Sequence, residues 1–221
     1  MLRSTFILAL QLGPAIFLVF AGWGFDNLSE FFSNPARCGL AALTLIAALA
    51  AIVFRLDLSP LRKGATPLGS QIIQLAILLF LSLALLWFLP FADRRNVLTL
   101  NHQYWRYFGL LLCVAGVIVR LLALKALGKQ FSAYVTLQPD HRLVQHGIYA
   151  IIRHPLYLSL LLLPTGVALV FASYLALPIL VLAAAFIFDR IRKEERLLAT
   201  HFPTEFDHYR LRTGRLVPGV F

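Results

Sequence analysis

Long apolar segments recur along this chain, and each has the length of a helix that crosses a lipid bilayer. They cover about residues 5–22, 37–54, 71–91, 107–127, 156–172 and 175–191. A helix needs roughly 20 mostly apolar residues to span the hydrocarbon core. Because 60% of the residues are hydrophobic and only 14% are charged, a soluble fold is excluded. The sequence therefore predicts an all-α, polytopic transmembrane helical bundle.

The last two apolar segments are separated only by Ala172, Ser173 and Tyr174. They predict a tight hairpin of two helices. A single broken element is the alternative, so the bundle has five or six spans. The apolar residues that follow Met1 lack a small-residue cleavage site before Trp23, and we interpret them as a retained first helix.

The net charge of +10 comes from basic residues in short loops and in the tail. They form no single folded basic face, so we expect membrane lipids as partners and no nucleic acid. Loops rich in Lys and Arg stay in the cytoplasm, and the tail from residue 190 onward is strongly basic. This predicts a cytoplasmic C-terminus, although Arg94, Arg95 and Arg106 fall in a predicted outer loop and oppose it.

The two halves of the chain differ in residue composition. Residues 1–125 are mostly Leu, Ala, Ile and Phe and predict transmembrane helices, whereas residues 126–221 gather His, Tyr, Arg, Glu, Gly and Pro. We expect function to reside in the second region of one membrane domain. Cys38 and Cys113 lie within or beside apolar segments, and the histidines lack zinc-ligand spacing, so neither a disulfide nor a metal is predicted.

A turn followed by a helix start is predicted within residues 141–157. Gly147 permits the turn, and Pro155 suits the first turn of a helix, so Arg153 and His154 fall at the helix N-terminus. Such an end binds carboxylates and other electron-rich groups. The alternative is that these residues only anchor the helix at the headgroups. The aromatic and polar side chains of this cofactor cradle are Tyr149, His154 and Tyr157.

Arg190 and Glu194 lie four residues apart at the end of the last apolar segment and share one helix face. They form either a functional pair or an ordinary surface ion pair of little energetic value. The tail beyond them contains Phe202 and Tyr209. It either packs back on the site as a lid or rests on lipid headgroups.

The order and spacing of these motifs resemble a known family. The pattern comprises residues 127–128, 141–144, 147–149, 153–157 and 190–195. Over about residues 125–215 the chain resembles the isoprenylcysteine carboxyl methyltransferase family, and the related membrane phospholipid methyltransferases share much of the pattern. One departure is at Leu158 and Ser159, which stand where the family has a small residue after its His-Pro-x-Tyr element.

This resemblance implies S-adenosylmethionine as the cofactor, bound at the cytoplasmic face, and a lipidic methyl acceptor that enters from the bilayer. Arg190 matches the family residue that meets the substrate. The residues that match the family's cofactor-binding positions are His141, Arg142, Leu143, Val144, Tyr149, His154, Pro155, Leu156, Tyr157 and Glu194.

Methyl transfer is a displacement at a sulfonium carbon and depends on positioning more than on acid–base chemistry. Arg190 suits the orientation of a carboxylate by two parallel hydrogen bonds. An ionised carboxylate is already nucleophilic, and we expect the acceptor to be the carboxylate of an isoprenylcysteine-like substrate. The amine of phosphatidylethanolamine is the alternative acceptor. It must lose a proton, for which Glu195 and His201 are the candidate catalytic bases.

Two other classes of function remain open. Membrane sterol reductases share a similar C-terminal helical region, but their NADPH carries a 2′-phosphate that calls for a denser basic cluster than Lys129, Arg142 and Arg153. A non-catalytic membrane protein would bind no cofactor. A transporter would place ionisable residues at mid-membrane, where the apolar segments carry almost none apart from Arg120.

Overall fold

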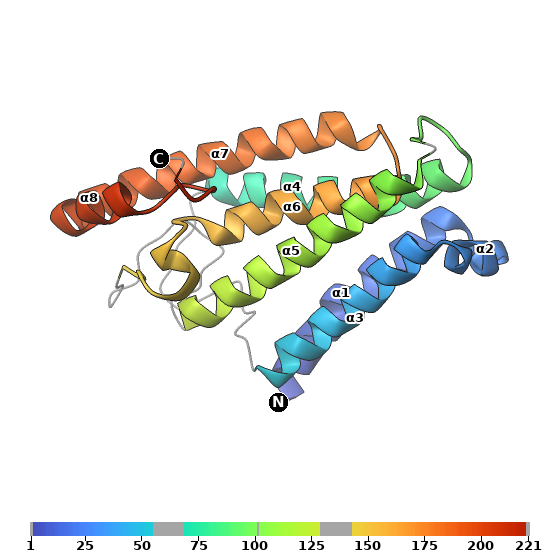
Figure 1. The fold of residues 1–221 in the computed structure, drawn as a ribbon, viewed down its shortest axis with the longest axis horizontal. Coiled ribbons are helices and arrows are strands. Elements are labelled where there is room, and N and C mark those ends of the chain that lie inside the picture. The colour runs from blue at the N-terminus through green and yellow to red at the C-terminus, as the bar shows by residue number, and fades with distance from the viewer. Residues whose placement is uncertain (1, 55–68, 101, 129–142, 220–221) are drawn as a thin grey trace.

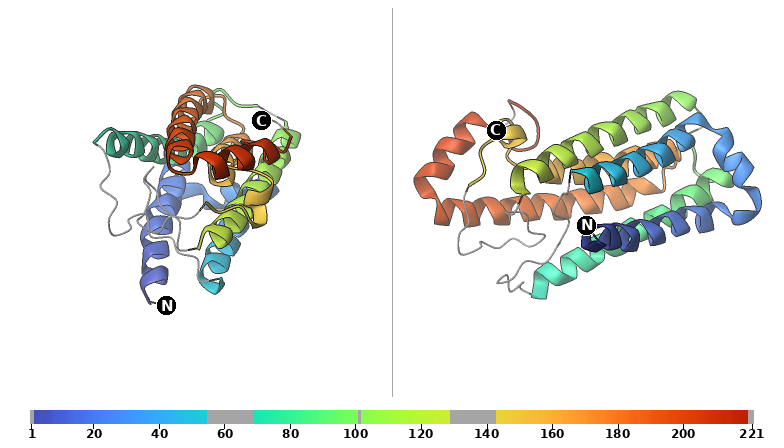
Figure 2. Two further views of the ribbon diagram at one scale, coloured as in Figure 1. Left: turned by 90° about the vertical axis from the view of Figure 1, so that its left-hand side faces the viewer. Right: turned by 90° about the horizontal axis from the view of Figure 1, so that it is seen from below.

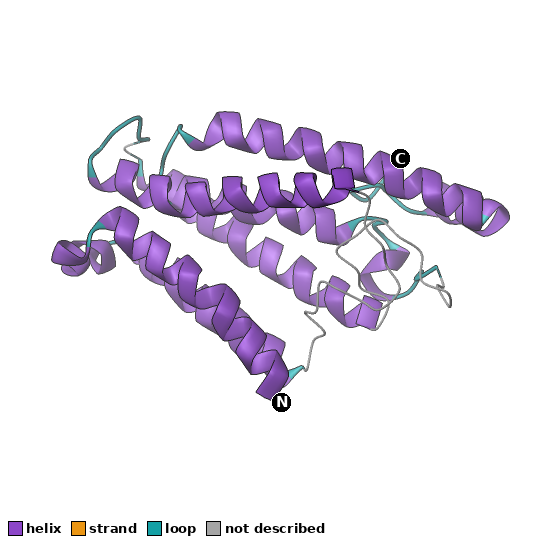
Figure 3. Cartoon of the chain, turned by 180° about the vertical axis from the view of Figure 1, so that it is seen from behind, coloured by secondary structure: helices purple, strands orange, loops and turns teal. Residues whose placement is uncertain are grey.

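The computed structural model describes residues 2–54, 69–100, 102–128 and 143–219. Within these ranges the regular structure is helical, and the helices run lengthwise in an elongated bundle (Figures 1 and 3). The elements are α1 (Leu2–Trp23), η1 (Phe25–Asn27), α2 (Leu28–Ser33), α3 (Pro35–Val53), α4 (Gly69–Arg94), α5 (Gln103–Leu127), η3 (Gly147–Ala150), α6 (Pro155–Val170), α7 (Ala176–His201) and α8 (Pro203–Arg212).

Each apolar segment predicted from the sequence coincides with one helix, namely α1, α3, α4, α5, α6 or α7. Three stretches, Pro35–Val53, Ile72–Arg94 and Gln103–Leu127, are long and apolar enough to cross a membrane, while α6 is a shorter apolar helix. The predicted all-helical membrane fold is confirmed for the described residues. The number of spans stays a prediction.

The last two apolar segments form the predicted hairpin. α6 and α7 are joined by residues 171–175, where Ala172 adopts a positive φ of 49°. This turn is held by the loop before α5, because the amide of Tyr174 donates to the carbonyl of Leu98 over 2.9 Å. α7 continues to His201, ten residues beyond the predicted apolar segment, and so carries Arg190 and Glu194 on one helix as expected. The charged residues of that extension are good helix formers.

Small residues allow α5 and α6 to approach closely. A Cβ atom added at Gly109 would lie 2.6 Å from the carbonyl oxygen of Gly166, and one added at Gly166 would lie 2.6 Å from the Sγ of Cys113. Glycine at both positions therefore permits backbone contact, a common device in membrane helix pairs. These two helices run side by side in both views of Figure 2. Their contact fixes the position of the N-terminus of α6.

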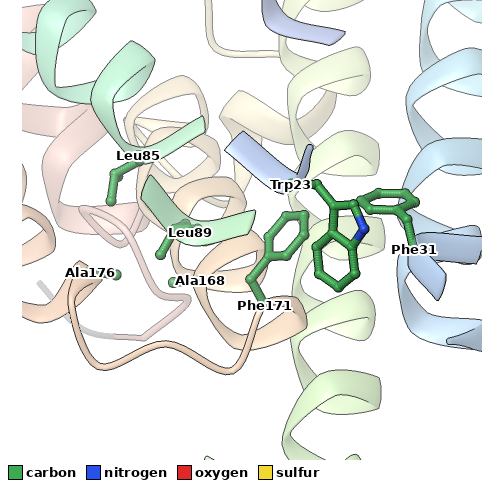
Figure 4. Packing of buried hydrophobic residues seen from close by; sticks show 7 residues of the cluster. All are labelled: Trp23, Phe31, Leu85, Leu89, Ala168, Phe171 and Ala176. Carbon is green, nitrogen blue, oxygen red and sulfur yellow. The ribbon is translucent and has the colours of Figure 1, made fainter. Parts of the chain in front are cut away.

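An apolar cluster closes the end of the bundle that lies far from α8. Figure 4 shows its side chains converging from α1, α2, α4, α6 and α7. Trp23 and Phe31 meet edge to face, with ring centroids 5.4 Å apart. The buried members of this cluster are Trp23, Phe31, Leu85, Leu89, Ala168, Phe171 and Ala176.

The arginines that oppose the predicted orientation are engaged by other side chains at this same end. Arg106 pairs with Asp93 over 2.5 Å, and Arg37 pairs with the same carboxylate over 2.9 Å. Arg94 pairs with Asp26 over 2.5 Å. Arg37 and Arg106 thus share one carboxylate, and Arg94 has a carboxylate partner of its own. Arg95 lies 4.4 Å over the ring of Phe91.

Candidate active site

The passage into α6 is built as the sequence predicts. Gly147 adopts a positive φ of 62° at the start of η3, and α6 begins at Pro155. Arg153 and His154, just before the helix, are only 7% and 4% exposed. Residues that merely anchored a helix at the headgroups would be solvated, so the burial of this pair argues against that alternative.

The backbone amides at this helix start are occupied by the chain itself. The amide of Arg153 donates to the carbonyl of Gly214 over 2.8 Å, and the amide of His154 donates to that of Arg215 over 3.1 Å. The anion-binding role predicted for this end is therefore not available at these two amides. A ligand at this end would instead be held by side chains or by the amides of the first turn of α6.

The carboxylate of Glu195 lies among three basic side chains. Glu195 accepts from Nε of Arg153 over 3.3 Å, lies 3.2 Å from Nε2 of His154, and accepts from Nη2 of Arg215 over 2.7 Å. We call these four residues the Glu195 cluster. Burial alone would raise the pKa of Glu195, but hydrogen bonds and charge attraction from His154 and Arg215 outweigh it and lower the pKa to about 2.

A second group of side chains lies one helical turn earlier on α7. Arg190 is 5% exposed, and its guanidinium carbon lies 6.0 Å from the ring centroid of Tyr157. The side chain of Tyr157 interacts with both Arg190 and Glu194. Burial, and then the charge of Glu194, raise the pKa of Tyr149. The buried position of Arg190 argues against the surface ion pair that was the alternative.

The remaining predicted residues take different places. Leu143 packs against the apolar cluster formed with α7 and α8, and Leu156 packs against Ala51 and Leu124. Val144 is half-buried and Pro155 is fully buried. The predicted cofactor residues His141 and Arg142 lie outside the described residues. Ser159, at the departure from the family pattern, is buried with its hydroxyl on the carbonyl of Leu156.

Tyr209, which the sequence analysis named, and further residues of the tail complete the surroundings. The hydroxyl of Tyr209 donates to the carbonyl of Tyr149 over 2.7 Å, so the tail packs back on the loop that precedes α6. Thr213 and Gly214 are buried beside Arg153. The available signal was apolar spacing, since Phe206 and Tyr209 lie three residues apart on one face of a polar helix.

The two adjacent glutamates thus have different surroundings. Glu195 contacts two arginines and one histidine, whereas Glu194 lies beside tyrosines and near one arginine. A carboxylate next to an aromatic face suits a cationic ligand, because both attract positive charge. The sulfonium and ammonium groups of S-adenosylmethionine have this chemistry. Within the described stretches of chain, no group of three or more His, Cys, Asp or Glu residues could hold a metal ion.

The fold and the long apolar helices place this chain among integral membrane proteins. A solved structure of the eukaryotic intramembrane Ras methyltransferase ICMT superposes with a TM-score of 0.57 at 20% identity, covering 92% of this chain and 73% of that one. The fold likeness therefore includes the N-terminal helices as well as the C-terminal region.

Residues 109–200 match the sequence model of the isoprenylcysteine carboxyl methyltransferase (ICMT) family, which confirms the predicted resemblance for this region. The protein-S-isoprenylcysteine O-methyltransferase of Tribolium castaneum is 32% identical over 51% of this chain and 41% of its own length. That of Saccharomyces cerevisiae is 34% identical over 51% of this chain and 48% of its own. The chain thus matches about half the length of these relatives or less.

Proposed function

We propose that this chain is an integral membrane methyltransferase that transfers a methyl group from S-adenosylmethionine to the carboxylate of an isoprenylcysteine-like lipid. The observation that carries the proposal is the buried guanidinium of Arg190, which lies beside Tyr157 and one turn from Glu194. This group sits in the family-matched region, where α7 leaves its apolar segment and becomes charged.

Arg190 is the residue we assign to the acceptor. A guanidinium fork holds a carboxylate through two parallel hydrogen bonds and keeps its charge at any working pH. Burial strengthens this interaction, because the surroundings screen charge less than water does. A carboxylate held in this way presents its oxygen in a fixed direction, and positioning is the main requirement of a methyl transfer.

Glu194 and the tyrosines are the residues we assign to the donor. S-adenosylmethionine supplies an activated methyl group, and its positive charges suit the carboxylate of Glu194 and the ring of Tyr157. Tyr149 lies within the electrostatic reach of Glu194, and its raised pKa keeps its hydroxyl protonated as a donor. His141 and Arg142 stay family-based expectations for the same site.

The charge state of Glu195 favours a carboxylate acceptor over a lipid amine. An amine has to lose a proton before or during methylation, so the enzyme needs a base near neutral pKa. Glu195 has a pKa of about 2 and is bound by Arg153, His154 and Arg215. It is a poor base, and we withdraw the base role that the sequence suggested for it. His201, the other candidate, is exposed near the end of α7.

The reductase alternative loses one of its three proposed phosphate ligands. Arg153 directs Nη1 to the backbone carbonyl of Arg210 over 2.9 Å and its Nε to Glu195. A guanidinium engaged in this way does not face a 2′-phosphate. Lys129 and Arg142 lie outside the described residues.

The basic tail supports a site that faces the cytoplasm, where a soluble donor enters while the lipid acceptor arrives through the bilayer.

The test is calorimetric titration of the detergent-purified protein with S-adenosylmethionine, and with NADPH in parallel, for wild type and for Glu194→Ala. We expect micromolar binding of the first ligand, weakened in the variant. Radiolabelled methyl transfer is then compared between a farnesylated, N-acetylated cysteine and phosphatidylethanolamine in mixed micelles. Labelling of the cysteine derivative supports the proposal, and binding of NADPH alone would overturn it.

A further inference from the structure

The chain beyond α8 returns to the start of α6, and residues 213–215 form a short strap along residues 151–154. Ile152 and Gly214 form an isolated parallel bridge. The amide of Gly214 donates to the carbonyl of Ile151 over 3.1 Å, while Gly214 and Arg215 accept from the amides of Arg153 and His154. Figure 2 (right) shows the end of the chain beside the yellow segment of η3. The strap thus pairs with the four residues that lead into the proposed donor site.

Side chains attach the strap at several further points. Arg153 donates through Nη1 to the backbone carbonyls of Arg210 and Thr213. Thr213 donates from its hydroxyl to the carbonyl of Tyr209 over 2.7 Å, and Tyr209 donates to the carbonyl of Tyr149. The contacts of Arg153 and of the Tyr209 hydroxyl join the tail to the loop that carries the proposed donor residues, and the Thr213 contact ties the strap to α8.

Arg215 holds His154 from two directions. Its carbonyl accepts from the amide of His154 over 3.1 Å, and its guanidinium binds Glu195 through Nε and Nη2. Glu195 in turn lies 3.2 Å from the imidazole Nε2 of His154. Arg215 and Glu195 therefore hold both the backbone and the side chain of His154. The imidazole ring of His154 in turn contacts Tyr157, with ring centroids 5.7 Å apart.

We propose that Glu195 and Arg215 form a latch that fastens the strap over residues 151–154 and thereby positions His154 and Tyr157 for the methyl donor. The inference rests on the proposed function and deepens it. Glu195 and Arg215 are positioning residues, and neither touches the reacting atoms. The strap lies beyond residue 200, where the family-matched region ends. The role therefore follows from the contacts of this chain.

Gly214 shows that the strap has a defined path. A Cβ atom added there would collide with the backbone carbonyl of Val217, which no side-chain rotation relieves. The tail therefore makes a tight turn directly after the strap. The strap is confined between the helix start on one side and the chain's own turn on the other.

The latch is tested with full-length protein carrying Arg215→Ala, Glu195→Gln or both, with Arg215→Lys as the conservative variant. Arg196→Ala is the matched control, because Arg196 is an exposed arginine on α7 and follows Glu195 directly. Hydrogen–deuterium exchange of residues 147–158 is measured by mass spectrometry, and it needs no ligand. Donor affinity and kcat at saturating donor are measured on the same samples.

We expect Arg215→Ala, which loses both hydrogen bonds to Glu195, to speed exchange in residues 147–158 and to weaken donor binding about tenfold. The kcat at saturating donor should stay within about threefold of wild type, because the latch acts before the chemical step. Arg215→Lys should recover part of the affinity. The double variant should be little worse than Glu195→Gln alone, since both changes break one contact. Arg196→Ala should match wild type.

Wild-type exchange and affinity in Arg215→Ala would overturn the latch. So would a Glu195→Gln variant that loses kcat at every donor concentration while Arg215→Ala does not, because Glu195 would then act on the reacting groups. If Arg215→Ala fails to fold, Arg215→Lys and Glu195→Gln still report exchange and affinity. If wild type binds no S-adenosylmethionine, the proposed function fails, and the exchange result alone decides whether the latch exists.

Discussion

The two ends of the bundle each hold a carboxylate between arginines, and the two arrangements differ in what surrounds them. The Asp93 cluster, formed by Asp93, Arg37 and Arg106, has a carboxylate side chain only 2% exposed. The Glu195 cluster has one that is 14% exposed. The first joins helices to one another, whereas the second joins a helix to a loop and a tail.

The arginines of the Asp93 cluster are directed at acceptors within the protein. Arg37 donates to the carbonyls of Phe31 and Glu30 as well as to Asp93, and it lies 4.3 Å over the ring of Trp23. A cavity of about 310 Å³ opens beside these residues. Because Arg37 and Arg106 already have partners within the protein, we assign them a structural role, which is to hold the helices together at this end. A buried carboxylate between arginines therefore does not by itself indicate a methyltransferase site. We assign the proposed site to the surroundings of Arg190.

The largest effect on activity is expected at Arg190. Arg190→Lys keeps the charge but removes the two-pronged geometry, so kcat/KM should fall about 100-fold or more. Donor affinity should change little, because the residue is assigned to the acceptor. Methyl transfer and calorimetry check both values, with Arg192→Lys, an exposed position two residues away, as the control. A variant that keeps full activity would remove Arg190 from the site.

The largest effect on stability is expected at the opposite end. Asp93→Asn leaves Arg37 and Arg106 buried without a counter-charge, and breaking a buried pair in this way costs about 3 kcal/mol. The apparent Tm in detergent should drop clearly, while the folded fraction still binds the donor with wild-type affinity. A loss of donor affinity without a loss of stability would contradict the division between the two ends.

The pH dependence of the Glu195 cluster sharpens the same comparison. The pKa of Glu195 is about 2 in the folded chain against an ordinary value of 4.5. The unfolded chain therefore binds the proton first as pH falls, so the stabilisation is fully present above about pH 4.5 and is lost between about pH 4.5 and 2. The difference in Tm between wild type and Glu195→Gln should stay constant above pH 5 and shrink below it. A difference that stays flat down to pH 3 would show that Glu195 is not held by the cations.

The architecture could be predicted from the sequence because it depends on apolar segment length, which is a local property. The six helices, the hairpin and the helix start at Pro155 all follow from such local signals. The helix was expected to continue past the apolar segment, because Arg190 and Glu194 were placed on one helix face, but its end at His201 was not predicted. Helix propensity continues through charged residues, so apolar length marks the membrane boundary and not the helix end.

The site was only partly predictable, because its remaining contacts join segments far apart in the chain. The strap lies 60 residues from the loop it holds, as the contact between Arg153 and Thr213 shows. No local pattern reports such a pairing. The partners of Glu195 were not predicted for the same reason, since the sequence shows a carboxylate beside Glu194 and gives no sign that Arg215 binds it.

The smallest effect is expected for Asp26→Asn, which tests whether the closed end depends on Asp93 alone. Asp26 pairs with Arg94 over 2.5 Å, and that hydrogen bond, with a backbone hydrogen bond and the charge of Arg94, lowers the pKa of Asp26 to about 2, although its side chain is 70% exposed. Exposed pairs contribute little because water and salt screen them, so Tm should change by about 2 °C or less, and the wild type and the variant should converge in high salt. If Asp26→Asn destabilises the protein as much as Asp93→Asn, the exposed loop is as important as the buried cluster.

Arg94 also donates to the carbonyl of Trp23, and that bond remains in the variant. The test therefore isolates the ion pair from the attachment of the loop to the bundle.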